Sequence, residues 1–340
     1  MIMGLGTYLP KELLTNDDIA DMMSTSDEWI RSRTGIKSRH RAGPDETTAS
    51  LGAEASKRAI EDAGLEPNDI DLIIMGTMFP DFTYPGPGMV IQQRVGIKRT
   101  IPVIDIRVQC PGFIYGLSMA DLYIRSGQAK HVLLVFAEKE FDHFKVDRQI
   151  GVIFGDGSGA AVIGPAKGDR GVYVTDIQGD GAGVPDLVMP SDNMPGLNKG
   201  EAVWPEELLK CKAYWQEKGF IEGHTKYPFW IGQEVFKNAV KRLIKSARAT
   251  MKETDWKIDD INHFFFHQAN ARINATLSEL LKLPSEKVPT NIERIGNTGA
   301  ASIPILMDEE KKAGRLKDGD ICVLSAFGAG YLWGTAIIKF

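Results

Sequence analysis

The chain has 340 residues, and domains of about 150 residues predict two domains or one large one. Lys and Arg total 40 against 45 Asp and Glu, which gives a formal net charge of −5, and 43% of the residues are hydrophobic. The acidic balance argues against a protein that binds nucleic acid or anionic membranes through bulk charge. The apolar content excludes a mainly disordered chain. Glycine is enriched, with 35 residues.

The cysteines and the two ends of the sequence bear on location. Cys110, Cys211 and Cys322 are far apart and form no CxxC pair, which argues against a disulfide framework or a thiolate metal site and fits a reducing compartment. The N-terminal residues lack the pattern of a secretory signal. The stretch 321–338 carries no charge, but glycines interrupt it, so it predicts two buried strands around a tight turn rather than a membrane span. We expect a cytoplasmic protein.

One long-period repeat organises the chain. A helical pattern over 49–63 and a strand over 72–76 in the first half correspond to a helix over 234–251 and a strand over 263–267 in the second. Further on, each half continues with a buried strand, a glycine turn and another buried strand, over 131–163 and 320–338. This predicts duplicated α/β halves, an N-terminal one over 1–170 and a C-terminal one over 171–340.

The strands are short and continuously apolar, which is typical of sheets that helices cover on both faces. Two such halves packed together predict a layered α/β/α/β/α arrangement. Between them the stretch Gly183–Tyr227, with four prolines and a helical pattern over 205–218, is too long for a plain connection. We therefore interpret it as a cap or binding loop.

Cys110 is the first candidate for chemistry. It follows a predicted strand over 103–108 and precedes Pro111 and Gly112, where a helical pattern begins. A cysteine at a helix N-terminus is expected to have a lowered pKa, because the helix dipole and free N–H groups stabilise the thiolate. The alternative is a small buried hydrophobic residue, the commoner role of a free cysteine and the one that fits Cys211 and Cys322.

Two polar residues could assist such a nucleophile. His267 ends the predicted strand over 263–267, where α/β folds place catalytic groups, whereas the other five histidines have no comparable setting. Asn297 lies in a turn before a helix of small residues, a position where asparagine is by default a helix cap. One interpretation is therefore a catalytic Cys/His/Asn site, and the other is that Cys110, His267 and Asn297 have only structural roles.

Six ordered motifs make the chain similar to the β-ketoacyl-acyl-carrier-protein synthase III family, almost from end to end. These motifs are Thr25-Ser-Asp-Glu-Trp-Ile30 with Arg33-Thr-Gly-Ile36, Cys110-x-Gly-Phe113, Phe154-Gly-Asp-Gly-Ser-Gly-Ala-Ala161, His267-Gln-Ala-Asn-Ala-Arg-Ile273, Gly296-Asn-Thr-Gly-Ala-Ala-Ser-Ile-Pro304, and Phe327-Gly-Ala-Gly330 with Trp333-Gly. The resemblance implies the thiolase fold, in agreement with the repeat, and a homodimer. It also implies an acyltransferase that starts fatty acid biosynthesis, and no metal or cofactor besides the coenzyme A thioester as substrate.

The resemblance assigns the chemistry to named positions. Cys110 would take the acyl group from an acyl-CoA, and His267 and Asn297 would hydrogen-bond the enolate formed when malonyl carrier protein loses CO2. The backbone N–H groups of Cys110 and Ala329 would form the oxyanion hole, and Phe327 would close the site. The coenzyme A contacts implied are Trp29, Arg33, Arg148, Phe236 and Arg272, and the carrier-protein contacts are Lys237 and Arg272. Tyr84 aligns with the residue that a partner subunit inserts over the acyl pocket.

The sequence departs from the family at several of these positions. The usual three-glycine turn is Gly328-Ala329-Gly330, and Glu279 and Leu280 stand where the family tends to have paired lysines. The bulk of Tyr84 indicates a short or unusual primer, while the enlarged stretch Gly183–Tyr227 could widen the pocket. Primer length and the choice between malonyl carrier protein and malonyl-CoA therefore stay open.

Three alternatives remain. The same site could serve a related acyltransferase or a specialised condensing enzyme of secondary metabolism. The glycine-rich segments 155–159 and 328–330 could instead be phosphate loops of a nucleotide-dependent oxidoreductase, although neither has the G-x-G-x-x-G spacing ahead of a helix. A binding protein without catalysis is the weakest alternative, because it would not need the nucleophile, the donors and the oxyanion loop together.

Overall fold

Two sheets form the framework of the protein. A computed structural model describes residues 1–144, 148–189, 206, 209, 213 and 229–340. The first sheet has the strand order β1-β7-β6-β4-β5, the second β11-β12-β13-β8, and the pairs β2–β3 and β9–β10 form separate two-stranded sheets. The strands are β1 Ile2–Tyr8, β2 Glu12–Thr15, β3 Ser38–Arg41, β4 Leu72–Gly76, β5 Val103–Ile106, β6 Val132–Glu138, β7 Gly157–Ile163, β8 Gly171–Gly179, β9 Leu187–Val188, β10 Phe229–Trp230, β11 His263–Phe266, β12 Ile321–Gly328 and β13 Leu332–Lys339.

The two sheets repeat one topology. In the first, β4 pairs parallel with β6, β6 antiparallel with β7, and β7 antiparallel with β1. In the second, β11 pairs parallel with β12, β12 antiparallel with β13, and β13 antiparallel with β8. The predicted repeat therefore corresponds to a repeat of strand order and direction. The predicted boundary between residues 170 and 171 falls between β7 and β8, where the chain passes from one sheet to the other.

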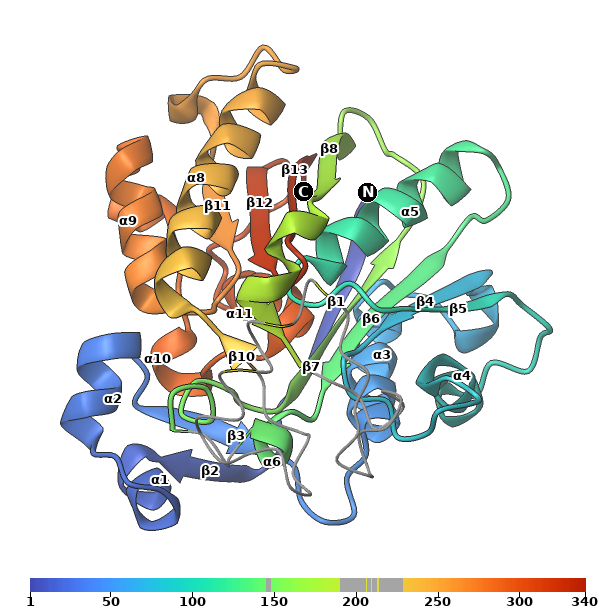
Figure 1. Ribbon diagram of the computed structural model, residues 1–340. Coiled ribbons are helices and arrows are strands. Elements are labelled where there is room, and N and C mark those ends of the chain that lie inside the picture. The colour runs from blue at the N-terminus through green and yellow to red at the C-terminus, as the bar shows by residue number, and fades with distance from the viewer. Residues whose placement is uncertain (145–147, 190–205, 207–208, 210–212, 214–228) are drawn as a thin grey trace.

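Helices lie on both sides of each sheet (Figure 1). Helix α3 contacts β1, β6 and β7, and α4 contacts β4 and β5, while α5 and α11 contact strands of both sheets. Helix α8 contacts β8, β12 and β13, and α9 packs on α8. Helices α5 and α11 therefore lie between the two sheets. The helices are α1 Asn16–Met22, α2 Asp27–Thr34, α3 Thr48–Asp62, α4 Pro87–Val95, α5 Gly112–Arg125, α6 Phe141–Phe144, α8 Gly232–Met251, α9 Ala271–Leu281, α10 Ile292–Ile295 and α11 Ser302–Lys312.

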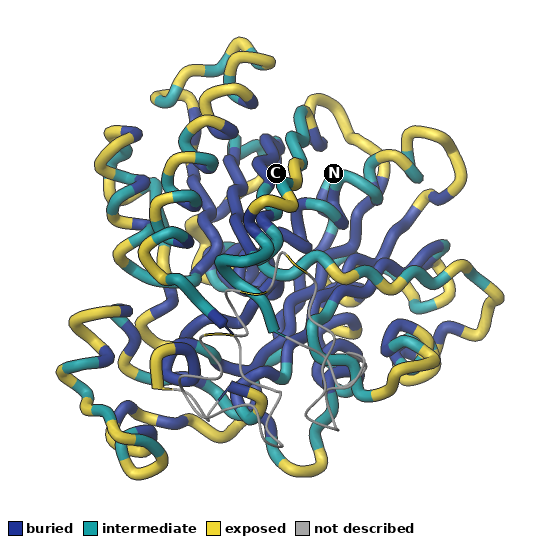
Figure 2. Tube along the Cα trace, viewed as in Figure 1, coloured by how far each residue is buried: buried dark blue, intermediate teal, exposed yellow. Residues whose placement is uncertain are grey.

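Burial explains why the apolar runs became central strands. Every residue of β4, β6 and β7 is buried, and Figure 2 shows the strands as the dark interior of the molecule. The largest apolar core joins the two sheets through residues such as Phe113, Phe136, Phe265 and Leu324. The uncharged stretch 321–338 forms the antiparallel strands β12 and β13, as predicted. Among the described residues, none of the helices has the length and apolar content needed to cross a bilayer.

The stretch Gly183–Tyr227 is described at its start, up to residue 189, and at residues 206, 209 and 213. The predicted helix over 205–218, Cys211 and His224 lie outside the continuously described ranges. Strand β9 pairs antiparallel with β10, so the chain returns to the same place on both sides of this stretch.

Candidate active site

Cys110, His267 and Asn297 lie on the wall of one cavity of about 1280 Å³. Cys110 follows β5 of the first sheet and precedes α5. His267 follows β11 of the second sheet, and Asn297 lies in the turn between α10 and α11. Residues separated by more than 150 positions are thus brought together between the two halves of the chain. The Cys/His/Asn interpretation predicts this convergence.

The predicted low pKa of the Cys110 thiol is wrong. Burial raises the pKa of Cys110 well above its ordinary value, and the charges of Glu140 and Glu138 raise it further. The residue does precede a helix, since Pro111 caps α5, but desolvation and two nearby acids outweigh the favourable helix dipole. Cys110 therefore rests as a neutral thiol, half-buried at the cavity wall.

The paired acids Glu138 and Glu140 are a feature that sequence reasoning missed. Both are buried, and Oε1 of Glu138 and both carboxyl oxygens of Glu140 have no hydrogen-bond partner in the described part of the chain. Burial raises the pKa of Glu138 to about 7, and burial together with the Glu138 and Asp156 charges raises the pKa of Glu140 well above its ordinary value. Thr77 Oγ1 and Met78 N each donate to Glu138 Oε2 at 3.0 Å. We therefore expect Glu140 to be the protonated member of the pair, because a buried carboxyl without hydrogen-bond donors is disfavoured as an anion.

Replacing Glu140 by glutamine is expected to stabilise the protein above neutral pH. A carboxyl whose pKa is raised by folding binds a proton that the unfolded chain releases, so wild-type stability falls as the pH rises from about 4.5 through the raised pKa. Glutamine keeps the shape without this penalty. The melting temperature of Glu140→Gln should exceed that of the wild type by about 3 °C at pH 8 and match it near pH 4.

The half-exposed Glu54, which pairs with Lys57, provides the control. Glu54→Gln should leave the pH dependence of melting unchanged. If the melting temperatures of Glu140→Gln and wild type differed by the same amount at every pH from 4 to 8, the raised pKa of Glu140 would be contradicted.

His267 is a neutral histidine with one nitrogen anchored. Its Nδ1 lies 2.6 Å from Oγ of Ser302, the first residue of α11, and its backbone N–H donates to the Ser325 carbonyl at 2.9 Å. Burial lowers the pKa of His267 to about 3, so the ring is uncharged at neutral pH. Its buried Nε2 has no hydrogen-bond partner in the described part of the chain. This atom is available to a molecule bound in the cavity.

The side-chain oxygen of Asn297 accepts a hydrogen bond within the protein, while its side-chain nitrogen does not donate to any described residue. The Gly299 N–H donates to Asn297 Oδ1 at 2.9 Å, which is the local capping role expected by default. That bond assigns the amide orientation and leaves the NH2 group without a partner among the residues described. Asn297 thus caps a turn and can also present a donor to the cavity.

The glycine-rich segment after Phe154 supports Asn297 instead of holding phosphate. Gly155 N donates to the Asn297 carbonyl and Asn297 N donates to the Ile153 carbonyl, both at 2.9 Å. The Asp156 carboxylate accepts backbone N–H bonds from Ala42, Glu140 and Phe141, at 2.7 to 2.9 Å. These groups are satisfied within the protein, so the phosphate-loop interpretation of residues 155–159 is wrong.

Gly328 brings the loop after β12 against the nucleophile. A Cβ atom built at Gly328 would lie 2.8 Å from Pro111 Cδ and 3.1 Å from Cys110 N. A side chain at this position would push these groups apart, so the close approach requires glycine. Gly328, Ala329 and Phe327 all line the cavity.

Replacing Gly328 by alanine is therefore expected to slow acylation of Cys110 by about 10- to 100-fold, because the added methyl displaces the loop or the nucleophile. The rate of acyl incorporation into Cys110 measures this. Gly181→Ala is the matched control, since a Cβ at Gly181 meets no atom within 4 Å. Equal acylation rates in the two variants would show that the loop need not approach Cys110.

The residues implied as coenzyme A contacts all line the same cavity: Trp29, Arg33, Arg148, Phe236 and Arg272. The guanidinium groups of Arg33 and Arg148 lie 4.7 and 5.1 Å from the centre of the Trp29 ring. Lys237 is exposed on α8 near the cavity-lining Phe236, and its ammonium is 4.0 Å from the Glu234 carboxylate. Tyr84 is 85% exposed and is not part of the cavity lining, whereas its neighbour Thr83 is.

In the ranges that the structure describes, no group of three or more His, Cys, Asp or Glu side chains could hold a metal ion. Cys322 is buried in β12, as the alternative of a small hydrophobic residue predicts.

Comparison with known proteins places this site in a family. The model described as 3-oxoacyl-[acyl-carrier-protein (ACP)] synthase III matches residues 104–183, which include Cys110. The model of the C-terminal part of the same enzyme matches residues 251–340, which include His267 and Asn297.

Full-length relatives agree with the two family models. The β-ketoacyl-[acyl-carrier-protein] synthase III of Caldanaerobacter subterraneus subsp. tengcongensis is 39% identical over 100% of this chain and 97% of its own length. The crystal structure of the synthase III from Aquifex aeolicus VF5 matches with a TM-score of 0.87 and 36% identity, over 100% of this chain and 99% of that one. The Thermus thermophilus structure matches with a TM-score of 0.88 and 33% identity, over 100% and 98%.

These matches span both sheets and all three candidate residues, and they confirm the predicted thiolase-like α/β fold. They favour the condensing enzyme over the oxidoreductase and the binding protein. The chain belongs to the 3-oxoacyl-[acyl-carrier-protein] synthase III family of acyltransferases.

Proposed function

We propose that this enzyme transfers an acyl group from acyl-CoA to Cys110 and condenses it with malonyl carrier protein, the reaction that initiates fatty acid synthesis. One observation carries the proposal: a cysteine thiol shares a cavity with two neutral side chains that each offer a free nitrogen, His267 Nε2 and the Asn297 amide. Neutral donors suit an enolate oxygen, because their hydrogen bonds stabilise its negative charge without transferring a proton to it.

In the first half-reaction the Cys110 sulfur attacks the thioester carbonyl of acyl-CoA. The new C–S bond forms first and gives a tetrahedral intermediate, the bond to coenzyme A then breaks, and the thiol proton leaves with the coenzyme A sulfur. The backbone N–H groups of Cys110 and Ala329 stabilise the tetrahedral intermediate. The close packing of Gly328 on Cys110 supports this assignment.

In the second half-reaction the malonyl thioester loses CO2, and its electron pair remains as an enolate. Hydrogen bonds from His267 and Asn297 lower the energy of that enolate. Its carbon attacks the acyl-Cys110 carbonyl, the C–S bond breaks, and one proton from solvent restores the thiol. Phe327, at the cavity wall, excludes water from the carbanion.

Substrate recognition follows from the charges around the cavity. Arginine and aromatic side chains suit the phosphates and the adenine ring of coenzyme A, which supports Trp29, Arg33, Arg148, Phe236 and Arg272 as its contacts. Exposed Lys237 and Arg272 are the contacts we assign to the carrier protein.

We further propose a homodimer in which Tyr84 covers the partner's acyl pocket. Phe82, Tyr84 and Met89 are large apolar side chains exposed on one segment, and β5 is an edge strand of the first sheet. The free thiols of Cys110 and Cys322 suit a reducing compartment, and we place the enzyme in the cytoplasm without any further cofactor.

Steady-state kinetics with a series of acyl-CoA primers and malonyl carrier protein tests the proposed reaction. The expected products are CO2, free coenzyme A and 3-oxoacyl carrier protein, with the parallel double-reciprocal plots of a ping-pong mechanism. Condensation with malonyl-CoA but not with malonyl carrier protein would show that malonyl-CoA is the second substrate. The absence of CO2 release with every primer would overturn the proposal.

A further inference from the structure

Ser302 occupies the one contact that decides which nitrogen of His267 carries hydrogen. A neutral imidazole has one N–H donor and one acceptor nitrogen, and the partner of one nitrogen fixes the role of the other. Nδ1 of His267 lies 2.6 Å from Ser302 Oγ, while Nε2 is buried and without a partner in the described residues. The direction of this single hydrogen bond therefore determines whether the cavity meets a donor or an acceptor.

A second contact settles that direction. The backbone N–H of Gln268 donates to the same Ser302 Oγ at 3.3 Å, so the hydroxyl oxygen already accepts one bond. If His267 Nδ1–H also donated to it, the Ser302 hydrogen would have no acceptor, since Ser302 makes no further hydrogen bond in the described part of the chain. Ser302 is fully buried, where an unpaired hydroxyl hydrogen is costly. With Ser302 donating to Nδ1, the Ser302 hydroxyl and Nδ1 are both satisfied, and the ring hydrogen lies on Nε2 of His267, which lines the cavity.

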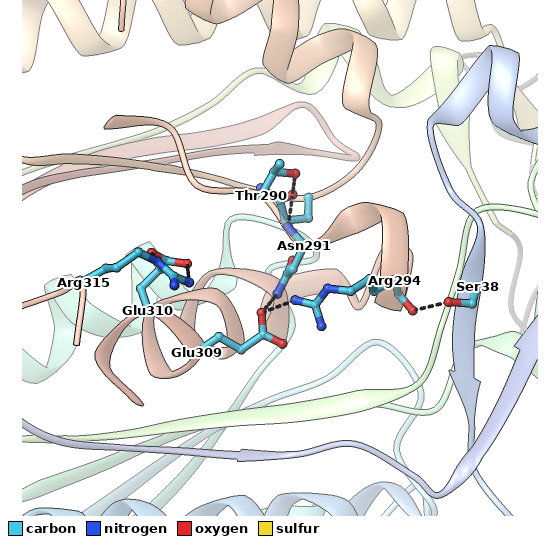
Figure 3. Close-up of polar contacts among 8 residues, drawn as sticks. Ser38, Thr290, Asn291, Arg294, Glu309, Glu310 and Arg315 are labelled. Atoms are coloured by element: carbon cyan, nitrogen blue, oxygen red, sulfur yellow. Dashed lines mark hydrogen bonds and ion pairs between the residues drawn. The ribbon is translucent and has the colours of Figure 1, made fainter. Parts of the chain in front are cut away.

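The surrounding network keeps Gln268 and Ser302 in this arrangement. Gln268 Nε2 donates to the Phe266 carbonyl at 2.8 Å, and its Oε1 accepts from Thr290 Oγ1 at 2.7 Å and from Asn291 N at 3.4 Å. Figure 3 shows the side chain of Asn291, which follows Thr290, pointing toward Glu309, whose Oε2 accepts from the Asn291 amide at 2.9 Å. Glu309 and Ser302 belong to the same helix, α11, so both ends of the network rest on one rigid element.

We propose that Ser302, supported by the backbone N–H of Gln268, is a positioning residue that holds His267 as the Nε2–H tautomer. His267 then presents a donor to the cavity beside the Asn297 amide. This inference rests on the proposed role of His267 in stabilising the enolate. It adds the reason why a neutral histidine donates there rather than accepts.

Nuclear magnetic resonance of wild-type protein with ring-¹⁵N histidine tests the tautomer without any activity measurement. The His267 resonances are assigned by their loss in His267→Gln. We expect a protonated Nε2 and an unprotonated Nδ1. A protonated Nδ1 with a bare Nε2 would overturn the proposal, even in an enzyme that condenses normally.

Ser302→Asp tests the consequence for catalysis. A carboxylate only accepts, so it would take the Nδ1 hydrogen, raise the pKa of the ring, and leave Nε2 a donor only while the ring carries two protons. Malonyl decarboxylation should therefore fall as the pH rises, to about 10²-fold below wild type near pH 8.5, while acylation of Cys110 is retained. Wild type should lack this pH dependence, because its His267 pKa is about 3.

Ser302→Thr, which keeps the hydroxyl, should behave as wild type. Ser56→Ala is the matched control, because Ser56 is a buried helix serine whose hydroxyl, within the described ranges, bonds only to the Gly52 carbonyl of its own helix. Wild-type decarboxylation by Ser302→Asp near pH 8.5 would overturn the proposal. If Ser302→Asp does not fold, the His267 tautomer measured by nuclear magnetic resonance in the wild type decides whether the proposal holds. A wild type that neither acylates Cys110 nor releases CO2 would refute the proposed function, and the resonance result would still stand.

Discussion

Cys110→Ala is expected to lower condensation by about 10⁴-fold or more, because the variant has no atom that can carry the acyl group. Loss of the sulfur leaves His267 and Asn297 in place, so release of CO2 from malonyl carrier protein should continue without condensation. Mass spectrometry of acyl incorporation and a CO2 assay measure the two steps separately. The expected combination is no acyl-enzyme with persistent decarboxylation.

Cys322→Ala is the control for loss of a buried thiol. Cys322 lies in β12 and belongs to the core between the sheets, away from the cavity wall. Its replacement should lower stability by removing packing and leave acylation intact. If Cys110→Ala still formed a covalent acyl-enzyme, the nucleophile would have to be another residue.

Asn297→Asp is expected to lower decarboxylation and condensation by about 10²- to 10³-fold and to spare acylation of Cys110. Aspartate keeps the oxygen that accepts from Gly299 N, so the turn is retained. It replaces the amide donor by a second carboxylate oxygen, which repels the developing enolate. Comparison of single-turnover acylation with CO2 release separates the two half-reactions.

Asn270→Asp controls for the added negative charge. Asn270 also lines the cavity, and its oxygen caps α9 by accepting from Arg272 N, a role that aspartate keeps. Its maximal decarboxylation rate should remain near that of wild type. Equal losses in Asn270→Asp and Asn297→Asp would mean that charge in the cavity, and not the missing donor, causes the defect.

The repeat and the strands could be predicted because the apolar runs carry them. The segments around 72–76 and 263–267 became β4 and β11, which occupy corresponding places in the two sheets. The glycine turn at 328–330 was predictable from its interruption of an apolar run. Residues 104–183 and 251–340 also match family models, and the candidate site residues Cys110, His267 and Asn297 lie within them.

The electrostatics of the site could not be predicted, because they depend on contacts between distant residues. Nothing near Cys110 in the sequence shows that Glu138 and Glu140 will raise its pKa. Their only signal is acidic residues at the end of an apolar strand, β6. In the same way, the contacts of the 155–159 loop with Asn297 and of Ser302 with His267 join segments that are 35 or more residues apart.

Capture and discharge of the acyl-enzyme test whether Cys110 carries the acyl group from acyl-CoA to the malonyl carrier protein. The wild-type enzyme is incubated with acyl-CoA, freed of excess substrate, digested and analysed by mass spectrometry, and a second portion is first mixed with malonyl carrier protein. We expect an acyl mass on the Cys110 peptide that disappears in the second portion as 3-oxoacyl carrier protein and CO2 appear. A Cys110 peptide that never gains an acyl mass, while condensed product still forms, would contradict it.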